Sequence, residues 1–361
     1  MKASMLNHNW NKDSAPNILI VLLGAIGDVT RAFPLIARIK KEWPKSKITW
    51  AVETNSSDLV RSCKFVDSVI EFKRSKGFKA YFQFVKKIRE SKYDLTLDLQ
   101  RHFKSGLTSF LSGSDKRVGF NYKNSREFNW IFNNYKIAPV HHFDDKIEQF
   151  MMFGDFISAE KIFHPYDYGI SVEPNEEEEF LKSISLKFAD FEGVVKNSVL
   201  FLIGSTWNSR KWPAKYYVDC ANEIFEKHKI YPIIIGAKSD IEMAREISEA
   251  VKVPIYNLVG LTTLKDFRIL SKLSKFGIGS DSGPLHIASG LGLKVVSFWG
   301  PTNPTRSRPY QNFDYAIRSP IGCQGCYQRT CPGLNKLCMT DIKPNVVMKV
   351  VDNLLQSRDS G

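Results

Sequence analysis

Residues 276–302 read FGIGSDSGPLHIASGLGLKVVSFWGPT, and this stretch decides the fold class. Apolar runs at 276–279 and 294–299 predict two buried strands with a helix between them. Neighbouring parallel strands need a crossover connection of this kind, so the stretch predicts one strand–helix–strand unit of a parallel sheet. Pro284 suits the first helical turn, where no N–H is needed, and Ser282 is a candidate N-cap.

The turn before this helix has the composition of an anion site. Asp281, Ser282 and Gly283 are small or polar, so they leave the first N–H groups of the helix open. Because the helix dipole also favours negative charge there, we expect a phosphate or diphosphate at the carboxyl edge of the sheet. His286 lies one turn further on and could make a charge-assisted contact. An ordinary capped helix with a packed histidine is the alternative.

Strand and helix alternate along the rest of the chain. We expect strands at 17–23, 47–52, 67–72, 94–99, 116–120, 198–203, 232–235 and 255–258, and helices at 30–43, 78–92, 144–157, 214–229, 264–274 and 344–356. Each half therefore predicts a doubly wound α/β domain. We expect the two Rossmann-like domains to face a central cleft that holds the ligand.

An acidic run that begins EPNEEEE at residue 173 marks the expected boundary between the halves. The expected organisation is a mobile polar N-terminal tail at 1–16, an N-terminal domain at 17–172, a linker helix region at 173–197, a C-terminal domain at 198–343, and a C-terminal helix and tail at 344–361.

Composition indicates a globular protein, because 43% of the 361 residues are hydrophobic and 25% are charged. No apolar run has the length of a bilayer span, and residues 1–16 lack the pattern of a signal peptide, so we expect a cytoplasmic protein. The net charge of +13, from 51 Lys+Arg against 38 Asp+Glu, favours nucleic acid, anionic lipid or a phosphorylated substrate as partner. The sequence contains no nucleic-acid-binding motif.

The first expected turn is GAIGD at 24–28, which departs from the dinucleotide fingerprint because its second glycine is misplaced. Glu53 lies near the end of the next strand, where an acid that binds the ribose of a dinucleotide would be expected. A nicotinamide-dependent oxidoreductase therefore remains an alternative. Otherwise Gly27 lets a substrate approach the backbone, and Asp28 either deprotonates an acceptor hydroxyl or only caps its helix. Pro34 fits only near a first turn, so we expect the helix to begin close to the glycines.

Two loops of the second half carry candidate donor-binding groups. In STWNSRKWP, residues 205–213, Arg210 and Lys211 could neutralise a diphosphate and Thr206 could donate its hydroxyl. Asp240 could accept the two hydroxyls of a ribose, or it could cap a helix. The alternative for the loop itself is a surface segment with solvated cations.

Basic and cysteine-rich segments complete the candidates. The aromatic helix at 78–92 either rests on an anionic membrane or presents a solvated face, and Arg101 and Lys104 could meet acceptor phosphates. Cys63 and Cys220 are expected in the core or at a strand edge. Four more cysteines, separated by two, four and six residues, could hold structural zinc, although clustered structural thiols are favoured over a metal; they are Cys323, Cys326, Cys331 and Cys338.

Together these motifs resemble glycosyltransferase family 9, the ADP-heptose:lipopolysaccharide heptosyltransferases, from residue 17 onward. The motifs are ILIVLLGAIGDV, YDLTLDLQ with the following Lys104-Ser105, KRVGF, RKWP, DSGPLHIASGLG, FWGPT and CMTDIKP. The resemblance implies the two-domain GT-B architecture and a metal-independent reaction that inverts the anomeric centre. The donor nucleotide would lie mainly on the C-terminal domain and the acceptor on the N-terminal one.

The resemblance also implies residue roles. Asp28 would be the general base, and Arg210, where the family usually has Lys, or Lys211 would hold the diphosphate. Asp240 would contact the ribose. Asp281, Ser282, Gly283 and His286 would line the diphosphate and sugar. The further substrate-binding candidates are Gly27, Thr206 and Pro284.

We therefore expect a heptosyltransferase of lipopolysaccharide core assembly at the inner face of the inner membrane. Its donor would be ADP-heptose, and its acceptor a phosphorylated, lipid-anchored glycan. The alternatives are a relative that transfers another sugar to a surface glycan, a nucleotide-binding oxidoreductase, and a basic adaptor whose cysteines bind metal.

Overall fold

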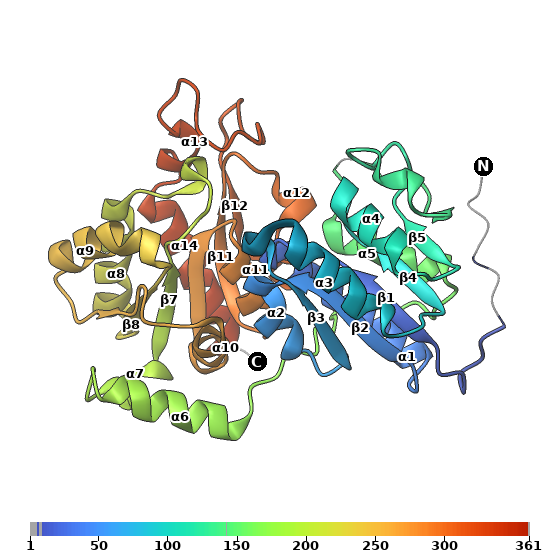
Figure 1. Cartoon of the computed structure of the whole chain (residues 1–361). Helices are drawn as coiled ribbons and strands as arrows, with labels where there is room; N and C mark the ends of the chain where they lie inside the picture. The colour runs from blue at the N-terminus through green and yellow to red at the C-terminus, as the bar shows by residue number, and fades with distance from the viewer. Residues whose placement is uncertain (1–5, 7–8, 142, 360–361) are drawn as a thin grey trace. The chain divides into compact units, whose positions relative to one another are not determined.

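The computed structural model describes residues 6, 9–141 and 143–359. The chain divides into two compact units, Met1–Ser171 and Val172–Gly361, and each contains its own six-stranded sheet (Figure 1). Among the described residues, no helix is both long and apolar enough to cross a bilayer.

The sheet of the first unit is parallel, with strand order β3-β2-β1-β4-β5-β6. Its strands are β1 (Asn17–Val21), β2 (Lys47–Glu53), β3 (Ser68–Phe72), β4 (Leu95–Asp98), β5 (Arg117–Gly119) and β6 (Tyr135–Lys136). The chain winds outward from β1 in one direction and returns through β4 in the other. The loops after β1 and β4 therefore meet at the switch point where doubly wound sheets bind ligands.

The helices of the first unit are α1 (Ile26–Glu42), α2 (Thr54–Arg61), α3 (Gly77–Arg89), α4 (Phe103–Leu111) and α5 (Lys146–Phe156). Helix α1 packs against α2 and α5, whereas α3 packs against α4. Since parallel crossovers are right-handed, the reversal of direction at β1 places these two groups on opposite faces of the sheet.

The second unit repeats the plan, with parallel order β12-β11-β10-β7-β8-β9. Its strands are β7 (Ser198–Leu202), β8 (Tyr231–Ile235), β9 (Tyr256–Asn257), β10 (Phe276–Ser280), β11 (Lys294–Trp299) and β12 (Ala316–Arg318). Its helices are α6 (Pro174–Ser185), α7 (Phe191–Val195), α8 (Ala214–His228), α9 (Ile241–Ala250), α10 (Leu264–Leu273), α11 (Gly283–Gly290), α12 (Pro304–Ser307), α13 (Leu337–Thr340) and α14 (Pro344–Asp359). The expected fold class, two doubly wound parallel-sheet units, is confirmed.

Two local expectations were wrong. Helix α1 begins at Ile26, close to the glycines as expected, but Pro34 lies in its interior and not in its first turn. A proline there removes a backbone hydrogen bond and costs about 3 kcal/mol, but every residue from 29 to 39 is buried, and this packing outweighs the cost. Helix α4 begins at Phe103, where the sequence predicted no helix, because its small buried residues pack against the sheet.

The N-terminal segment also differs from the expected mobile tail where it is described. Leu6 is buried and donates its N–H to the carbonyl of Phe156 over 2.8 Å. The ring of Trp10 meets Trp43 edge to face at 5.4 Å. Residues 1–5 and 7–8 lie outside the described residues.

Candidate active site

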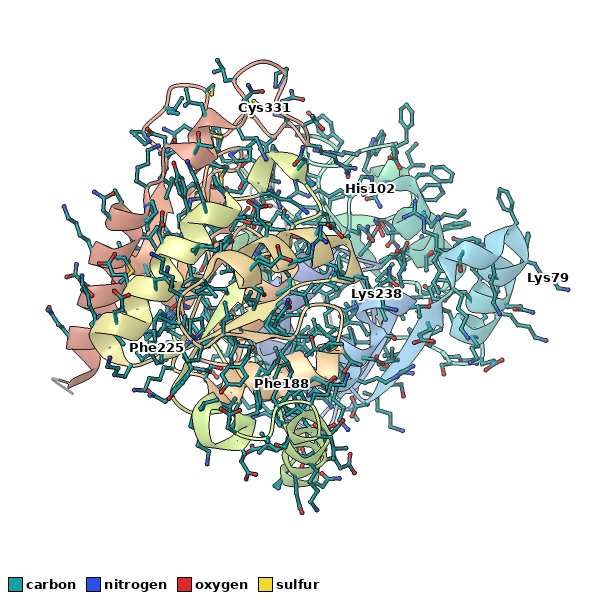
Figure 2. The ribbon with its side chains drawn as sticks, turned by 90° about the vertical axis from the view of Figure 1, so that its left-hand side faces the viewer. Lys79, His102, Phe188, Phe225, Lys238 and Cys331 are labelled. Carbon is teal, nitrogen blue, oxygen red and sulfur yellow. The ribbon has the colours of Figure 1, made fainter. Side chains whose placement is uncertain are left out.

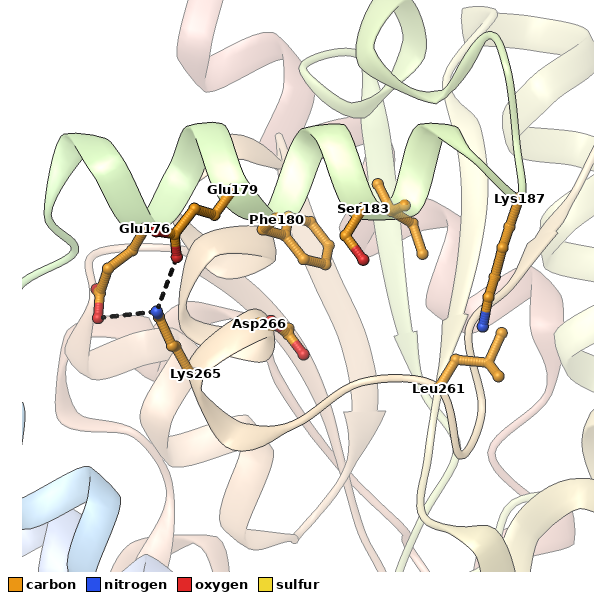
Figure 3. A pocket seen from close by; sticks show the side chains of 9 residues that line it. Glu176, Glu179, Phe180, Ser183, Lys187, Leu261, Lys265 and Asp266 are labelled. Carbon is orange, nitrogen blue, oxygen red and sulfur yellow. Dashed lines mark ion pairs between the residues drawn. The ribbon is translucent and has the colours of Figure 1, made fainter.

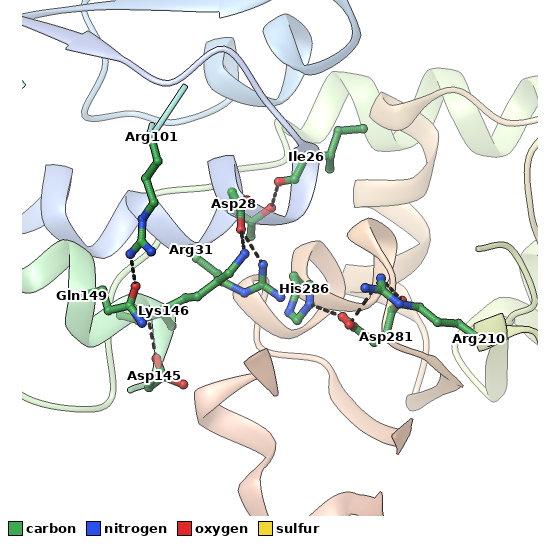
Figure 4. Close-up of polar contacts among 12 residues, drawn as sticks. Ile26, Asp28, Arg31, Arg101, Asp145, Lys146, Gln149, Arg210, Asp281 and His286 are labelled. Carbon is green, nitrogen blue, oxygen red and sulfur yellow. Dashed lines mark hydrogen bonds and ion pairs between the residues drawn. The ribbon is translucent and has the colours of Figure 1, made fainter. Parts of the chain in front are cut away.

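Asp281, which directly follows the carboxyl end of β10, contacts both a cation and an imidazole (Figure 4). Arg210 Nη1 lies 3.3 Å from Asp281 Oδ2 and donates to the Asp281 carbonyl over 3.1 Å. His286 Nε2, on α11, lies 3.2 Å from Asp281 Oδ1. The guanidinium of Arg210 also stacks 3.8 Å from the centre of the Trp207 ring. The carboxylate therefore holds a cation and an imidazole beside the start of α11.

Three buried hydroxyls at the carboxyl ends of the neighbouring strands β10 and β11 have no hydrogen-bond partner among the described residues. They belong to Ser280 at the end of β10, Ser282 at the N-cap of α11, and Thr302 after β11. Ser282 occupies the expected N-cap position, but its side chain makes no capping bond. Because an unpartnered buried hydroxyl costs about 1–3 kcal/mol, the three hydroxyls are suited to a ligand that accepts hydrogen bonds.

A second ion pair lies at the ends of β7 and β8. Lys211 Nζ is 2.8 Å from Asp240 Oδ1, and Asp240 Oδ2 accepts the N–H of Ala237 over 3.1 Å. A Cβ on Gly204 would come within 2.7 Å of Asp240 Oδ2, so the carboxylate fits only because residue 204 is glycine. Thr206 is exposed on the same loop.

In the first unit, Asp28 stands in the first turn of α1, but it does not cap the helix. Ala25 is the N-cap residue, without a side-chain capping bond. Asp28 Oδ1 lies 2.9 Å from Arg31 Nη1 and also forms an ion pair with Lys146 of α5 (Figure 4). Its carboxylate remains about one-third exposed, at 32%. Two cations thus orient an acid that solvent and small molecules can reach.

The candidate acceptor-binding cations come from the segment after β4. Arg101 donates to Gln149 Oε1 of α5, and its guanidinium lies 4.1 Å above the Phe120 ring. Lys104 Nζ lies 4.9 Å from the centre of the Phe72 ring. These contacts hold both cations at the carboxyl edge of the first sheet.

The buried carboxylate of Asp98 is hydrogen-bonded to the beginning of the same segment. Asp98, the last residue of β4, accepts hydrogen bonds from Asn129 Nδ2 at 2.6 Å and Asn133 Nδ2 at 3.1 Å. The Gln100 N–H donates to it over 3.2 Å, and Gln100 Oε1 accepts the Leu23 N–H at 2.9 Å. Burial raises the pKa of Asp98 to about 6, although these hydrogen bonds oppose the shift.

The cysteine-rich loop, residues 322–338, is hydrogen-bonded to the turn after β11 and to the loop at 205–213. Gly325 donates its N–H to the Gly300 carbonyl over 2.8 Å, and Ser209 donates its N–H to the Arg329 carbonyl over 3.1 Å. Cys323 and Cys326 are exposed, while Cys338 is buried and its thiol pKa is raised to about 11 by burial. Within the described residues, no group of three or more His, Cys, Asp or Glu is arranged to hold a metal ion.

A hollow of about 170 Å³ lies between α6 and the start of α10 (Figure 3). Lys265 forms ion pairs there with Glu176 and Glu179, each at 3.6 Å. Because these cation–carboxylate pairs already satisfy one another, we assign no role in substrate binding to the hollow.

The structure brings Arg210, Asp281 and His286 together as one group, and Lys211 and Asp240 as another. The sequence analysis missed Ser280, Thr302, Arg31 and Lys146 as members of these sites. Position alone could have found Ser280 and Thr302, since Ser280 directly follows one predicted strand and Thr302 lies in the turn after another, three residues past its end. Lys146 gave no signal, because its partner lies 118 residues earlier in the chain.

Comparison with known proteins adds the decisive observation. The model of glycosyltransferase family 9 (heptosyltransferase) matches residues 81–337. The chain belongs to glycosyltransferase family 9. It is therefore a transferase enzyme, and the expected family is confirmed.

Relatives of this family 9 chain share most of its length. It is 27% identical over 307 residues to the lipopolysaccharide core heptosyltransferase OpsX of Haemophilus influenzae, covering 84% of each chain. Its fold matches the family 9 glycosyltransferase of Veillonella parvula with a TM-score of 0.80 and 17% identity, covering 96% of this chain and 99% of that one. Escherichia coli WaaC, solved with ADP-2-deoxy-2-fluoro heptose, matches with a TM-score of 0.71 and 20% identity, covering 93% of this chain and 99% of that one. These similarities support the GT-B architecture.

Proposed function

We propose that this enzyme transfers heptose from ADP-heptose to a sugar of a lipopolysaccharide core, with inversion at the anomeric carbon and without a catalytic metal. The observation that carries the proposal is the set of buried, unpartnered hydroxyls of Ser280, Ser282 and Thr302 at the carboxyl ends of β10 and β11, the edge where Arg210 pairs with Asp281. The similarity to OpsX, and the ADP-heptose analogue bound to WaaC, support the choice of donor and acceptor.

The second unit would hold the donor. Its diphosphate would lie at the N-terminus of α11, where Gly283 offers an N–H and Pro284 has none to offer. Arg210 and the hydroxyls would stabilise the negative charge that develops on ADP as the glycosidic bond breaks. Asp240, with Lys211, would bind the ribose hydroxyls. These cations and dipoles give the leaving group its charge compensation without a metal.

The first unit would hold the acceptor. Asp28 would remove the proton from the attacking hydroxyl, which then displaces ADP from the opposite side of the anomeric carbon. Arg31 and Lys146 would orient the carboxylate for this role, and Gly27 would let the acceptor approach the backbone. Arg101 and Lys104 would bind acceptor phosphates.

We further propose that the enzyme works in the cytoplasm at the inner face of the inner membrane, since a lipid-linked acceptor would be presented there. The net charge of +13 supports contact with a phosphorylated, anionic partner. A structural metal on the cysteine loop stays a hypothesis, and metal analysis of the purified protein would decide it.

The test combines binding and turnover. Calorimetry with ADP, UDP and NAD, followed by transfer assays with ADP-heptose and truncated core lipids, should show ADP binding and heptose transfer. The variant Asp28→Ala should abolish transfer and leave ADP affinity nearly unchanged. The matched variant Asp58→Ala, an acid on α2, should retain transfer. Tight NAD binding without ADP-sugar turnover would refute the proposal in favour of an oxidoreductase, and turnover with another nucleotide sugar would reassign the donor.

A further inference from the structure

Large apolar side chains are exposed along one edge of the first unit. They lie on α3, on α4 and on the short helix η2 (Asn129–Ile131) and its flank. The members are between 47% and 86% exposed; they are Phe78, Phe82, Phe103, Phe110, Phe128 and Ile131. Figure 2 shows aromatic rings that project outward near the labels Lys79 and His102. We call these residues the aromatic surface.

The exposure on α3 follows from its sequence. Ala80, Phe84 and Ile88 recur at four-residue spacing and are buried against the sheet. Phe78 and Phe82 have the same spacing but lie on the other side of the helix, and Lys86 extends their stripe by a further turn. Helix α3 therefore has two apolar stripes, and the sheet covers only one of them.

Contacts between the elements make the surface continuous. Tyr81 of α3 and Thr108 of α4 share a hydrogen bond of 3.0 Å between their hydroxyls. The ring of Phe132, directly after η2, meets Phe103 at 5.1 Å and Phe110 at 6.3 Å. The exposed side chains thus belong to one packed group of elements.

The charged residues within α3 and the segment just before it are all basic, although Arg74 pairs with Glu53 at 3.5 Å and Glu90 follows the helix. Residues 73–89 contain no Asp or Glu, and their basic residues are all exposed; these are Lys73, Arg74, Lys76, Lys79, Lys86, Lys87 and Arg89. An apolar surface for a second protein would not require such a concentration of cations. Phenylalanines next to lysines and arginines are instead typical of helices that lie in the interface of an anionic bilayer.

We propose that the aromatic surface docks this enzyme on an anionic lipid bilayer, with Phe78 and Phe82 inserted among the headgroups and the cations of residues 73–89 bound to lipid phosphates. The surface adjoins the segment that carries Arg101 and Lys104, because Phe103 opens the helix between them. Membrane docking would bring the enzyme to its lipid-linked acceptor. Only this purpose of the docking rests on the proposed function.

The test measures co-sedimentation of the full chain with vesicles that contain phosphatidylglycerol and with vesicles of phosphatidylcholine alone. Wild type should bind only the anionic vesicles, and added salt should weaken binding. The double variant Phe78→Ser/Phe82→Ser should bind at least about tenfold more weakly. The double variant Lys79→Glu/Lys86→Glu should lose its preference for anionic vesicles. Phe163→Ser is the matched control, since Phe163 is 78% exposed on a segment joined to α1, on the opposite face of the sheet.

Equal binding of wild type and the phenylalanine double variant would overturn the proposal, as would binding that salt does not weaken. A wild type that self-associates and ignores vesicles, while the double variant is monomeric, would instead assign the surface to a second copy of the chain. Heptose transfer to a delipidated core oligosaccharide separates the two proposals. The phenylalanine variant should retain that transfer, and its absence in wild type would refute the proposed function while leaving the vesicle result to stand.

Discussion

At the scale of single residues, the proposed donor site is marked by polar groups that the fold leaves unsatisfied. Ser289 lies on α11, the helix whose N-cap residue is Ser282. The Ser289 hydroxyl accepts a hydrogen bond from Asn312 Nδ2 at 2.6 Å. Ser282 has no such partner among the described residues, although its side chain is also buried. The contrast separates a serine that stabilises the fold from one that is placed for a ligand.

Replacement of Ser282 by alanine should weaken ADP binding about five- to thirtyfold, because one hydrogen bond to a charged group is worth about 1–2 kcal/mol. The free energy of unfolding should not fall, since the lost hydroxyl bonds nothing in the chain. Isothermal titration calorimetry and urea unfolding measure the two effects. Ser289→Ala should do the reverse, destabilising the fold with unchanged ADP affinity, and a loss of stability in Ser282→Ala would contradict the assignment.

Asp98 should make the stability of the first unit depend on pH. Its pKa is raised from 3.8 to about 6, so the folded chain binds this proton more tightly than the unfolded chain does. The free energy of unfolding should therefore fall as pH rises from 4 to above 6, by about 3 kcal/mol from this group alone. Urea unfolding of wild type and Asp98→Asn between these pH values tests this, and parallel pH profiles would exclude the role.

At the scale of elements, the position of helix α11 depends on the preceding strand, β10, which contains Gly277 and Gly279. A Cβ on Gly279 would lie 2.7 Å from the Leu202 carbonyl oxygen of β7, whereas a Cβ on Gly277 would lie 3.3 Å from Val295 Cγ1. A backbone carbonyl in a sheet cannot move aside, while a methyl group can. The close approach of β10 and β7 therefore depends on Gly279.

The variant Gly279→Ala should destabilise the second unit by about 1–3 kcal/mol, because the added methyl group overpacks the sheet. Gly277→Ala, in the same strand, should cost less and serves as the control. Thermal unfolding followed by circular dichroism compares the two variants. If Gly277→Ala proved the more harmful, the argument from backbone contact would fail.

Elements with strong periodicity could be predicted from the sequence, and long-range partners could not. The stretch at 276–302 predicted β10, α11 and β11, because a buried strand pair with a short helix leaves a clear apolar pattern. Helix α4 was missed, since its small residues Ser105, Gly106 and Ser109 resemble a loop in composition. The site residues on turns were found by their type, but the Asp28–Lys146 pair joins two helices that only the tertiary fold brings together.

At the scale of the whole molecule, each unit has its own sheet and its own helices on both faces. The buried core of the second unit includes residues from α8, α9 and α14 packed on one side of its sheet. Each unit therefore has the means to fold cooperatively. Ligands bound within one unit should stabilise that unit directly.

ADP should accordingly raise the stability of the second unit by about 2.7 kcal/mol at a concentration one hundred times its dissociation constant. Hydrogen exchange of the full chain should show slower exchange in β7, β10 and α11, with little change in β2 and β3. Protection that appeared first in the loop after β1 would move the nucleotide site to the first unit and contradict the proposed division of roles.

The cysteine-rich loop offers a built-in reporter. Its backbone is joined to the turn after β11 by Tyr327, whose N–H donates to the Pro301 carbonyl over 2.8 Å, and to the segment before Arg210 by Ser209. Cys323 and Cys326 are exposed on this loop, whereas Cys63 and Cys220 are buried with thiol pKa values raised by burial. A maleimide dye would therefore label the loop selectively, and its fluorescence would follow nucleotide occupancy in the native chain without any engineered cysteine.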